Sequence, residues 1–573
     1  MTFFKRNLFF ILLAAAVFAV FGKAVFYTEM LLDDIIYVQR YHLLTFSLEN
    51  LKIWQQPILG LWGPLTAYSF MLDFLIWGKE YLFPGAHLMN ILLHFLAACA
   101  FYTGARLLKF SRFAAGAAVL FWALHPQRAE SVAWLCERKD VLLLALGLWS
   151  IVLFIKAIKE KRRGYYALSL LFFLLSFCIK PALIGLPLVL TAYLWGRYRK
   201  KDPVFYLCRT GPFWLLSLLY YIGFKLVTDG GNMTGAAGIS DQITLIGWRY
   251  GNYLVKTFIP LGLTPMYPHF SVAADSLLPL YAAGAVILLL LFFLYKGSQK
   301  ALYIWLPCFL AWSAAVAPGL FRIGDVDFAD RYSYFPSVFA VLAAASLLCT
   351  LVKKYPQTRK PVIFLACLLP ALMAILCFQE LDVWKNKDTY TAAALAVRRP
   401  HYRCLIEEAV ICFDKGDFEG AGRYIEQLRS GSRDVPEISK LTIGLFIDSI
   451  EGAMLVRSGK TAAGMKKVIQ VLSHPRWDLL KNTTYGYPRF ILLLAAGFFQ
   501  KNGNRQAAAE MYRRIAGIYA SFEPLEKEFY LALAALCLDD RNTALKHFEE
   551  ALKFNPDDEN IRKNIEALRR QAK

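Results

Sequence analysis

Two adjacent carboxylates, Asp33 and Asp34, lie just past the end of an apolar run from Leu8 to Tyr27. A run of ~20 apolar residues is long enough to cross a bilayer as a helix, so the pair is expected at a membrane surface. A carboxylate there can take the proton from an acceptor hydroxyl. Alternatively, the pair can share a divalent cation such as Mg²⁺ or Mn²⁺, because hard cations prefer carboxylate oxygens. The sequence leaves open which aspartate would act as the base.

A second group of charged and histidine residues lies near the ends of other apolar runs. An interfacial enzyme that uses a lipid-phosphate donor would need cations or hydrogen-bond donors where negative charge grows on the departing phosphate. We therefore expect this group to bind the substrate and the donor phosphate. Its members are His125, Arg128, Glu130, Arg138, Lys139, Asp140, Lys180, His269, Asp330 and Arg331.

Several members of this group also have structural interpretations. Glu130 and Asp140 can cap helices or pair with neighbouring arginines, because charge networks occur in scaffolds as well as in sites. Asp330 can form a salt bridge with Arg331. We favour phosphate binding by Arg331, because arginine makes bidentate contacts with phosphate. Lys180 can instead extend along apolar surface towards water.

The elements that position these residues are predicted to be membrane helices. The chain has 573 residues, of which 57% are hydrophobic and 19% charged, against ~45–50% and ~25% in soluble domains. The apolar excess is confined to residues 1–380, whereas residues 381–573 have the composition of a soluble helical protein. We therefore predict an all-α polytopic membrane domain, 1–380, followed by a second domain, 381–573.

Apolar run lengths predict about eleven membrane spans. Ionisable residues are scarce within them, which argues against a transporter with a charged pathway. The predicted spans are Leu8–Tyr27, Leu88–Ala105, Phe113–Leu124, Val141–Ile155, Tyr165–Ile179, Ala182–Trp195, Trp214–Val227, Leu277–Tyr295, Leu302–Leu320, Tyr332–Leu351 and Val362–Phe378.

The net charge of +21 comes from Lys and Arg clustered in the short gaps between apolar runs. Such clustering follows the positive-inside rule for cytoplasmic loops, so no nucleic-acid partner is expected. Counting spans places Asp33, Asp34 and the second domain on the opposite, extracytoplasmic side. The count requires that Trp248–Leu263, which carries Arg249 and Lys256, lies in the interface rather than crossing the membrane.

The second domain contains repeats. Residues Asp414–Ala421 and Phe499–Tyr512 have the pattern of a turn entering a second helix, and Gly459–Val471 is a weaker case. Phe529–Pro556 matches the ~34-residue tetratricopeptide template best, with small residues where paired helices touch. Arrays of this kind bind proteins or peptides. The sequence does not indicate whether Cys404, Cys412 and Cys537 in this domain form a disulfide.

Several motifs match one known family. They are Leu124–Asp140, Gly63–Thr66 with Met71–Asp73 and His87–His94, Tyr267–His269, Gly324–Pro336, and Trp384-Lys-Asn386 before the repeats. Over nearly its whole length and in its domain order, the chain resembles the transmembrane and tetratricopeptide-repeat-containing O-mannosyltransferase family and its bacterial relatives. The Asp330-Arg331-Tyr-x-Tyr-x-Pro336 segment is the most distinctive.

The resemblance implies a GT-C glycosyltransferase fold followed by an α-solenoid of tetratricopeptide type. It also implies a catalytic acid in the first extracytoplasmic loop and a polyprenyl-phosphate-linked sugar donor. A protein Ser/Thr hydroxyl would be the acceptor, and a bacterial inner membrane would be the location. Two other functions remain open, namely an inactive membrane-anchored repeat scaffold and a transporter or flippase of lipid-linked sugars.

Overall fold

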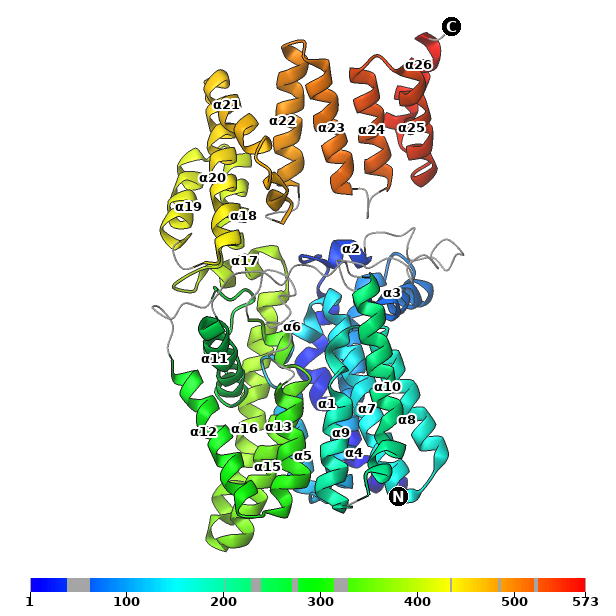
Figure 1. The fold of residues 1–573 in the computed structure, drawn as a ribbon, viewed down its shortest axis with the longest axis vertical. Helices are drawn as coiled ribbons and strands as arrows, with labels where there is room; N and C mark the ends of the chain where they lie inside the picture. Colours follow the sequence, from blue (N-terminus) through cyan, green and yellow to red (C-terminus); the bar gives the residue numbers. More distant parts are fainter. Residues whose placement is uncertain are drawn as a thin grey trace. The chain divides into compact units, whose positions relative to one another are not determined.

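The computed structural model shows a helical protein with two compact units, Met1–Ala396 and Val397–Lys573 (Figure 1). Within the described residues every regular element is a helix. The structure describes residues 2–38, 62–200, 202–227, 239–269, 277–313, 328–432, 435–482, 486–519 and 524–571.

The first unit contains long helices joined by short helical turns. In chain order these elements are α1 (Thr2–Phe21), η1 (Gly22–Phe26), α2 (Asp34–Val38), α3 (Pro64–Trp77), α4 (Leu82–Leu107), α5 (Arg112–Ala123), α6 (Arg128–Ala133), η4 (Leu135–Glu137), α7 (Arg138–Glu160), α8 (Arg163–Phe177), η5 (Pro181–Leu183), α9 (Leu186–Tyr198), α10 (Pro203–Val227), α11 (Ile239–Phe258), α12 (Leu278–Tyr295), η6 (Ala301–Trp305), α13 (Leu306–Trp312), η8 (Asp330–Ser333), α15 (Pro336–Lys354), η9 (Pro356–Thr358), α16 (Arg359–Glu380), η10 (Leu381–Trp384) and α17 (Lys387–Leu395).

All eleven predicted spans fall on helices, apart from the part of Leu302–Leu320 outside the described residues. Six helical segments in the described chain are long and apolar enough to cross a membrane. They are Asn7–Phe26, Leu82–Leu107, Leu135–Glu160, Leu278–Tyr295, Pro336–Lys354 and Pro356–Trp384. Three shorter apolar helices, Arg112–Ala123, Arg163–Phe177 and Ala301–Trp312, accompany them. The protein is thus a membrane protein, and the count of eleven spans stays a prediction.

Helix α4 lies at the centre of the first unit and packs against α1, α3, α5 and α7. Its buried face is rich in alanine, including Ala97, Ala98 and Ala100, and small residues let membrane helices approach closely. By contrast, α12 and α16 expose large apolar side chains such as Leu288 and Phe364. Extensive apolar exposure of this kind marks a surface that lipid covers.

The short helices α2, α3 and α6 gather at the end of the bundle opposite to the N-terminus (Figure 1). The chain reaches this end after α1 and again between α5 and α7, because each long helix carries it across the bundle. This arrangement brings the first loop, with Asp33 and Asp34, to the segment Arg128–Asp140.

The polar residues of the predicted interfacial segment Trp248–Leu263 face the protein interior. This segment begins within α11, and Arg249, Asn252 and Lys256 are buried there. The Lys256 ammonium group donates hydrogen bonds to the carbonyl oxygens of Leu261 and Gly262, at 2.9 and 2.8 Å. The polar residues that suggested an interfacial helix therefore make internal contacts, and the interfacial position stays a prediction.

The first unit ends after Ala396, later than the predicted boundary at residue 380. Residues beyond 380 remain in this unit because they pack on its loops. The Trp384 ring stacks on the Trp134 ring at a centroid distance of 5.8 Å. The Lys387 backbone N–H donates to the Glu29 carboxylate at 3.1 Å.

The second unit is a series of helical hairpins. Successive pairs pack together, and α26 packs on α25. The elements are α18 (Tyr402–Asp414), α19 (Phe418–Gly431), α20 (Glu437–Arg457), α21 (Thr461–Leu472), η12 (Trp477–Asn482), α22 (Tyr487–Lys501), α23 (Arg505–Tyr519), α24 (Pro524–Cys537), α25 (Arg541–Phe554) and α26 (Glu559–Gln571).

The four predicted repeat turns coincide with the turns of these hairpins. Gly416, Gly459 and Gly503 adopt positive φ angles there, at 81°, 86° and 74°, a conformation that glycine reaches without steric cost. These turns follow one another at longer intervals than the ~34 residues of the tetratricopeptide template. The hairpin array is thus observed, and its assignment to that repeat family stays a prediction. All eleven cysteines are free thiols, so Cys404, Cys412 and Cys537 form no disulfide here.

The contact between α20 and α21 requires glycine. A Cβ atom at Gly464 would overlap the Gly452 carbonyl oxygen and the Val456 backbone nitrogen, whereas a Cβ atom at Gly422 in α19 would meet nothing within 4 Å. We expect Gly464→Ala to destabilise the second unit by about 1–3 kcal/mol through overpacking. The matched variant Gly422→Ala should be neutral or more stable, because alanine favours a helix interior. Pulse proteolysis of the full chain against temperature measures both, and equal effects would contradict the proposed close contact.

Candidate functional site

Asp34 holds the first loop against the segment that joins α6 to α7. One of its carboxylate oxygens accepts a hydrogen bond from the Leu31 backbone N–H at 3.0 Å. The other accepts from the Cys136 backbone N–H at 2.7 Å. The side chain is 2% exposed. Burial raises the pKa of the Asp34 carboxyl to about 7, although these hydrogen bonds lower it. Asp34 is therefore committed to structure, with both oxygens engaged.

Asp33 is the more accessible carboxylate of the pair. It precedes α2 and is partly exposed, and its charge interacts with that of Lys139 and lies near the Tyr37 hydroxyl. The two aspartates, which the sequence could not distinguish, thus have different surroundings. Asp33 is partly exposed, whereas Asp34 is buried.

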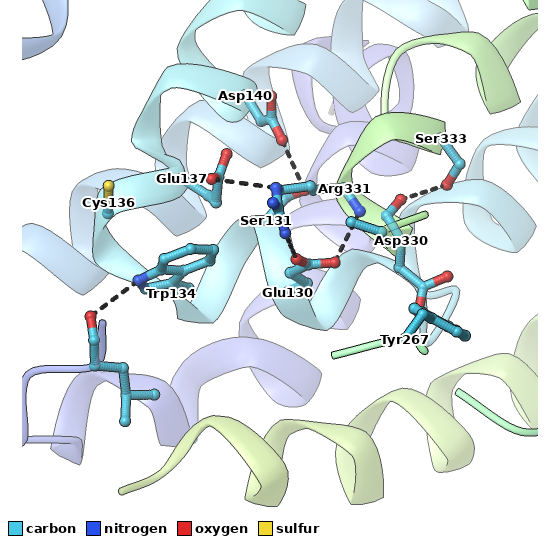
Figure 2. Close-up of polar contacts among 12 residues, drawn as sticks. Glu130, Ser131, Trp134, Cys136, Glu137, Asp140, Tyr267, Asp330, Arg331 and Ser333 are labelled. Carbon is cyan, nitrogen blue, oxygen red and sulfur yellow. Dashed lines mark hydrogen bonds and ion pairs between the residues drawn. The ribbon is translucent and has the colours of Figure 1, made fainter. Parts of the chain in front are cut away.

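Three cations that retain some exposure gather beside the carboxylates. The side chains of Arg331, Lys139 and Lys180 are 15%, 13% and 17% exposed. Figure 2 shows the Arg331 guanidinium between the carboxylates of Glu130 and Glu137. The Arg331 backbone N–H also donates to Glu130 at 2.8 Å.

The two lysines complete the same network. Lys139 pairs with Glu137 at 3.2 Å, and Lys180 forms an ion pair with Asp140. Burial lowers the pKa of Lys180 to about 8. Among its neighbours Glu137 raises this pKa, whereas Lys139 and Arg331 lower it. The like charges affect one another, so the three cations converge on one region.

Glu130 is a second carboxylate whose pKa is raised, beside Asp34. Burial raises its pKa to about 7, against the lowering effect of Arg331. Arg331 thus favours the charged form of Glu130, and Glu130 in turn helps to raise the pKa of Arg331. The two groups stabilise each other as an ion pair in a buried place.

Arg138 does not belong to this accessible group, although it was predicted to bind phosphate. It is fully buried and forms an ion pair with Asp73. Its remaining donors reach the Asn90 side-chain oxygen at 2.8 Å and the carbonyl oxygens of Ala86 and Ser69 at 2.6 and 3.3 Å. The neighbouring Lys139 pairs with Glu137 instead. The adjacent cations Arg138 and Lys139 therefore contact different carboxylates.

Arg128 is likewise enclosed. Its guanidinium donates to the hydroxyl oxygens of Ser333 and Ser337 at 2.8 and 3.1 Å, so it joins α6 to η8 and α15. Neither Arg128 nor Arg138 has an exposed donor for a ligand. We therefore revise both from phosphate ligands to structural residues.

Asp330 and the two predicted histidines belong to a neighbouring buried cluster. Asp330 accepts hydrogen bonds from the Gln127 amide and the Tyr267 hydroxyl, both at 2.8 Å. It does not pair with Arg331, which points the opposite way (Figure 2). Burial raises the pKa of Asp330 and lowers that of His125, where Arg128 adds to the effect. His269 is also buried.

A metal shared by Asp33 and Asp34 is not supported by this geometry. Both Asp34 oxygens already accept backbone hydrogen bonds. Within the described ranges, no group of three or more His, Cys, Asp and Glu residues is placed to hold a metal ion.

The structure thus brings seven predicted residues together and sets five apart. The first set is Asp33, Asp34, Glu130, Lys139, Asp140, Lys180 and Arg331. The second set is His125, Arg128, Arg138, His269 and Asp330. Sequence reasoning missed Glu137, whose spacing of three from Asp140 along one helical turn was the available signal. It also missed Asp73, for which no signal marked the partner of Arg138.

Comparison with known proteins gives local similarity to O-mannosyltransferases. The chain is 38% identical over 93 residues to Protein O-mannosyl-transferase Tmtc1 of Drosophila melanogaster, covering 15% of this chain and 11% of that protein. It is 33% identical over 105 residues to Tmtc2 of the same organism, covering 18% and 11%. The matches thus span about a tenth of those relatives' length. No family model matches the chain. Together with the apolar helices, the similarity suggests a membrane glycosyltransferase.

The buried pair of Arg138 and Asp73 yields a stability test. Arg138→Met leaves the Asp73 carboxylate without its cation in a buried site, which should cost about 3–5 kcal/mol. The double variant Arg138→Met/Asp73→Leu should regain most of that loss, because an apolar pair of similar volume replaces the buried ions. Thermal unfolding of the purified full chain measures both. A stable single variant would show that Arg138 is not part of the scaffold.

Proposed function

We propose that the protein is a membrane glycosyltransferase of GT-C type. It moves a sugar from a polyprenyl-phosphate donor to a protein Ser or Thr hydroxyl on the extracytoplasmic side. One observation carries the proposal. A partly exposed carboxylate, Asp33, interacts electrostatically with Lys139, and Lys139 belongs to a network with two further partly exposed cations, Lys180 and Arg331. The similarity to proteins named O-mannosyl-transferases supports it.

In the proposed reaction Asp33 acts as general base. The acceptor oxygen loses its proton to the Asp33 carboxylate and forms a bond to the anomeric carbon of the sugar. The bond from that carbon to the phosphate oxygen breaks, and its electron pair leaves with the polyprenyl phosphate. Attack from the face opposite to the leaving group inverts the anomeric configuration.

The cations Lys139, Lys180 and Arg331 stabilise the departing phosphate. Negative charge grows on the phosphate in the transition state, and preorganised cations in a water-poor site stabilise it strongly. Arg331 suits this role because its planar guanidinium makes paired hydrogen bonds to phosphate. Its side chain is 15% exposed, so it can contact the phosphate while it stays paired with Glu130.

The apolar helices supply the place for the polyprenyl tail, because they surround the end of the bundle where the site lies. The proposal gives the hairpin unit, Val397–Lys573, the role of binding the acceptor protein. Arrays of paired helices present extended surfaces for such partners.

The identity of the base is tested with Asp33→Asn. We expect kcat for sugar transfer to fall by about 10²–10⁴-fold, the usual contribution of a general base, with an unchanged unfolding temperature. Asp34→Asn is the matched control. It should lower the unfolding temperature, because an amide nitrogen cannot accept the backbone hydrogen bond that a carboxylate oxygen accepts. The measurement is transfer of labelled sugar from polyprenyl-phosphate mannose to a Ser/Thr peptide by purified full chain.

Two results would contradict this proposal. Transfer by Asp33→Asn at the wild-type rate would exclude Asp33 as the base. Movement of labelled lipid-linked sugar across proteoliposomes without a new glycosidic bond would indicate a transporter instead.

The role of Lys180 is tested by pH. Because the pKa of Lys180 is lowered to about 8, its positive charge is present below that pH and is lost as pH rises through it. KM for the donor should therefore rise above pH 8. Lys180→Arg retains its charge at higher pH. In this variant KM for the donor should therefore begin to rise only at a higher pH. If KM depends on pH in the same way in Lys180→Arg and in the wild type, another group causes the change.

A further inference from the structure

A recess of about 500 Å³ opens where α9 ends and η6 begins. Among the described residues it is lined by Trp195, Arg199, Lys200 and Leu302. Its two walls are held together by Gly196, where a Cβ atom would overlap the Leu302 backbone. The backbones of Gly196 and Leu302 are in direct contact here, so the packing of α9 on η6 fixes the shape of the recess.

The recess lies far from the candidate site. Helix α9 starts just after η5, which directly follows Lys180, and Arg199 comes directly after its last residue. Thirteen helical residues rise about 20 Å, at ~1.5 Å per residue. Lys180 and Arg199 are thus near opposite ends of α9, and a ligand in this recess would not touch the cations of the candidate site.

The charges around the recess differ from those of the candidate site. There, each accessible cation pairs with a buried carboxylate. Around the recess, the cations of α9 and of the segment leading into η6 have no carboxylate within ion-pair distance in the described part of the chain. They are Arg197, Arg199, Lys200, Lys296 and Lys300. Lys300 donates to the Thr350 hydroxyl instead.

An exposed apolar stripe leads into the recess along α9. Leu188 and Trp195 are both exposed, and their spacing of seven residues places them on one face of the helix. Tryptophan is enriched where a membrane helix meets the head groups, since its ring is apolar while its N–H is polar. The recess therefore combines unpaired positive charge with an apolar path running along a membrane helix.

We propose that this recess binds the phosphate head group of an anionic membrane phospholipid. Arg199 and Lys200 bind the phosphate, and an acyl chain lies along Leu188 and Trp195. Basic pockets between membrane helices bind anionic head groups in this manner. A soluble phosphate would use the cations but not the apolar stripe, so the stripe selects the lipid. This site does not depend on the proposed glycosyltransferase function.

The test is lipid binding by the purified full chain in detergent, followed by native mass spectrometry. Phosphatidylglycerol and phosphatidylcholine with the same acyl chains are titrated separately. The variant Arg199→Gln/Lys200→Gln is compared with Lys353→Gln/Lys354→Gln, which removes two exposed cations at the end of α15. We expect the first variant to bind phosphatidylglycerol about tenfold more weakly or worse, at roughly 1 kcal/mol per cation. The control should change by less than about twofold.

Three results would overturn the proposal. Equal losses in the two double variants would show general charge attraction. Equal binding of the two lipids would show that the head-group charge is not recognised. Displacement of phosphatidylglycerol by an equal concentration of glycerol phosphate would indicate a site for a free anion.

Folding of the variants is checked by their unfolding temperature. If the double variant is unstable, Lys200→Gln and Trp195→Ala replace it. Lys200→Gln removes one cation and should weaken the binding of phosphatidylglycerol but not that of phosphatidylcholine. Trp195→Ala removes the apolar wall and should weaken the binding of both lipids. Wild-type binding by both substitutes would contradict the site.

Discussion

The ion pair between Arg331 and Glu130 holds the candidate site together. It joins side chains separated by 201 residues of sequence, and Glu137 extends it to the start of α7. Charges this deeply buried are stable only when paired, because their desolvation costs several kcal/mol per ion. The loop before α15 must therefore lie against α6 for either group to be satisfied. The same network includes Lys139 and Lys180, and the charge of Asp33 interacts with that of Lys139.

Much of the fold could be predicted because apolar run length is a local property. Within the described residues each predicted span falls on a helix, and the four repeat turns are hairpin turns. The burial of a side chain within the bundle, by contrast, depends on residues far away in the sequence. Arg138 and Lys139 are adjacent, yet one is sealed against Asp73 and the other reaches Glu137. Helix rotation separates the two side chains by ~100°, and only the packing of α7 against α4 decides which face is buried.

The residues of the candidate site could be predicted only in part, and their roles could not: seven of the twelve named residues lie together, and Glu137 was missed. Asp33 and Asp34 are equivalent in sequence, and the difference arises from Cys136, whose backbone N–H selects Asp34. A salt bridge between Asp330 and Arg331 was one structural interpretation of the sequence, and the structure does not form it. The short helix η8 turns the two side chains apart towards different elements.

The stack of Trp134 on Trp384 joins the segment after α16 to the loops of the first unit. The Trp134 indole N–H donates to the Leu31 carbonyl oxygen at 3.2 Å, and the Arg331 guanidinium lies 5.4 Å from the centre of its ring. One indole thus contacts the first loop, the cation group and the segment after α16. A membrane fragment that stopped at residue 380 would lack the ring that covers Trp134. The first compact unit therefore includes residues beyond the end of the apolar sequence, up to Ala396.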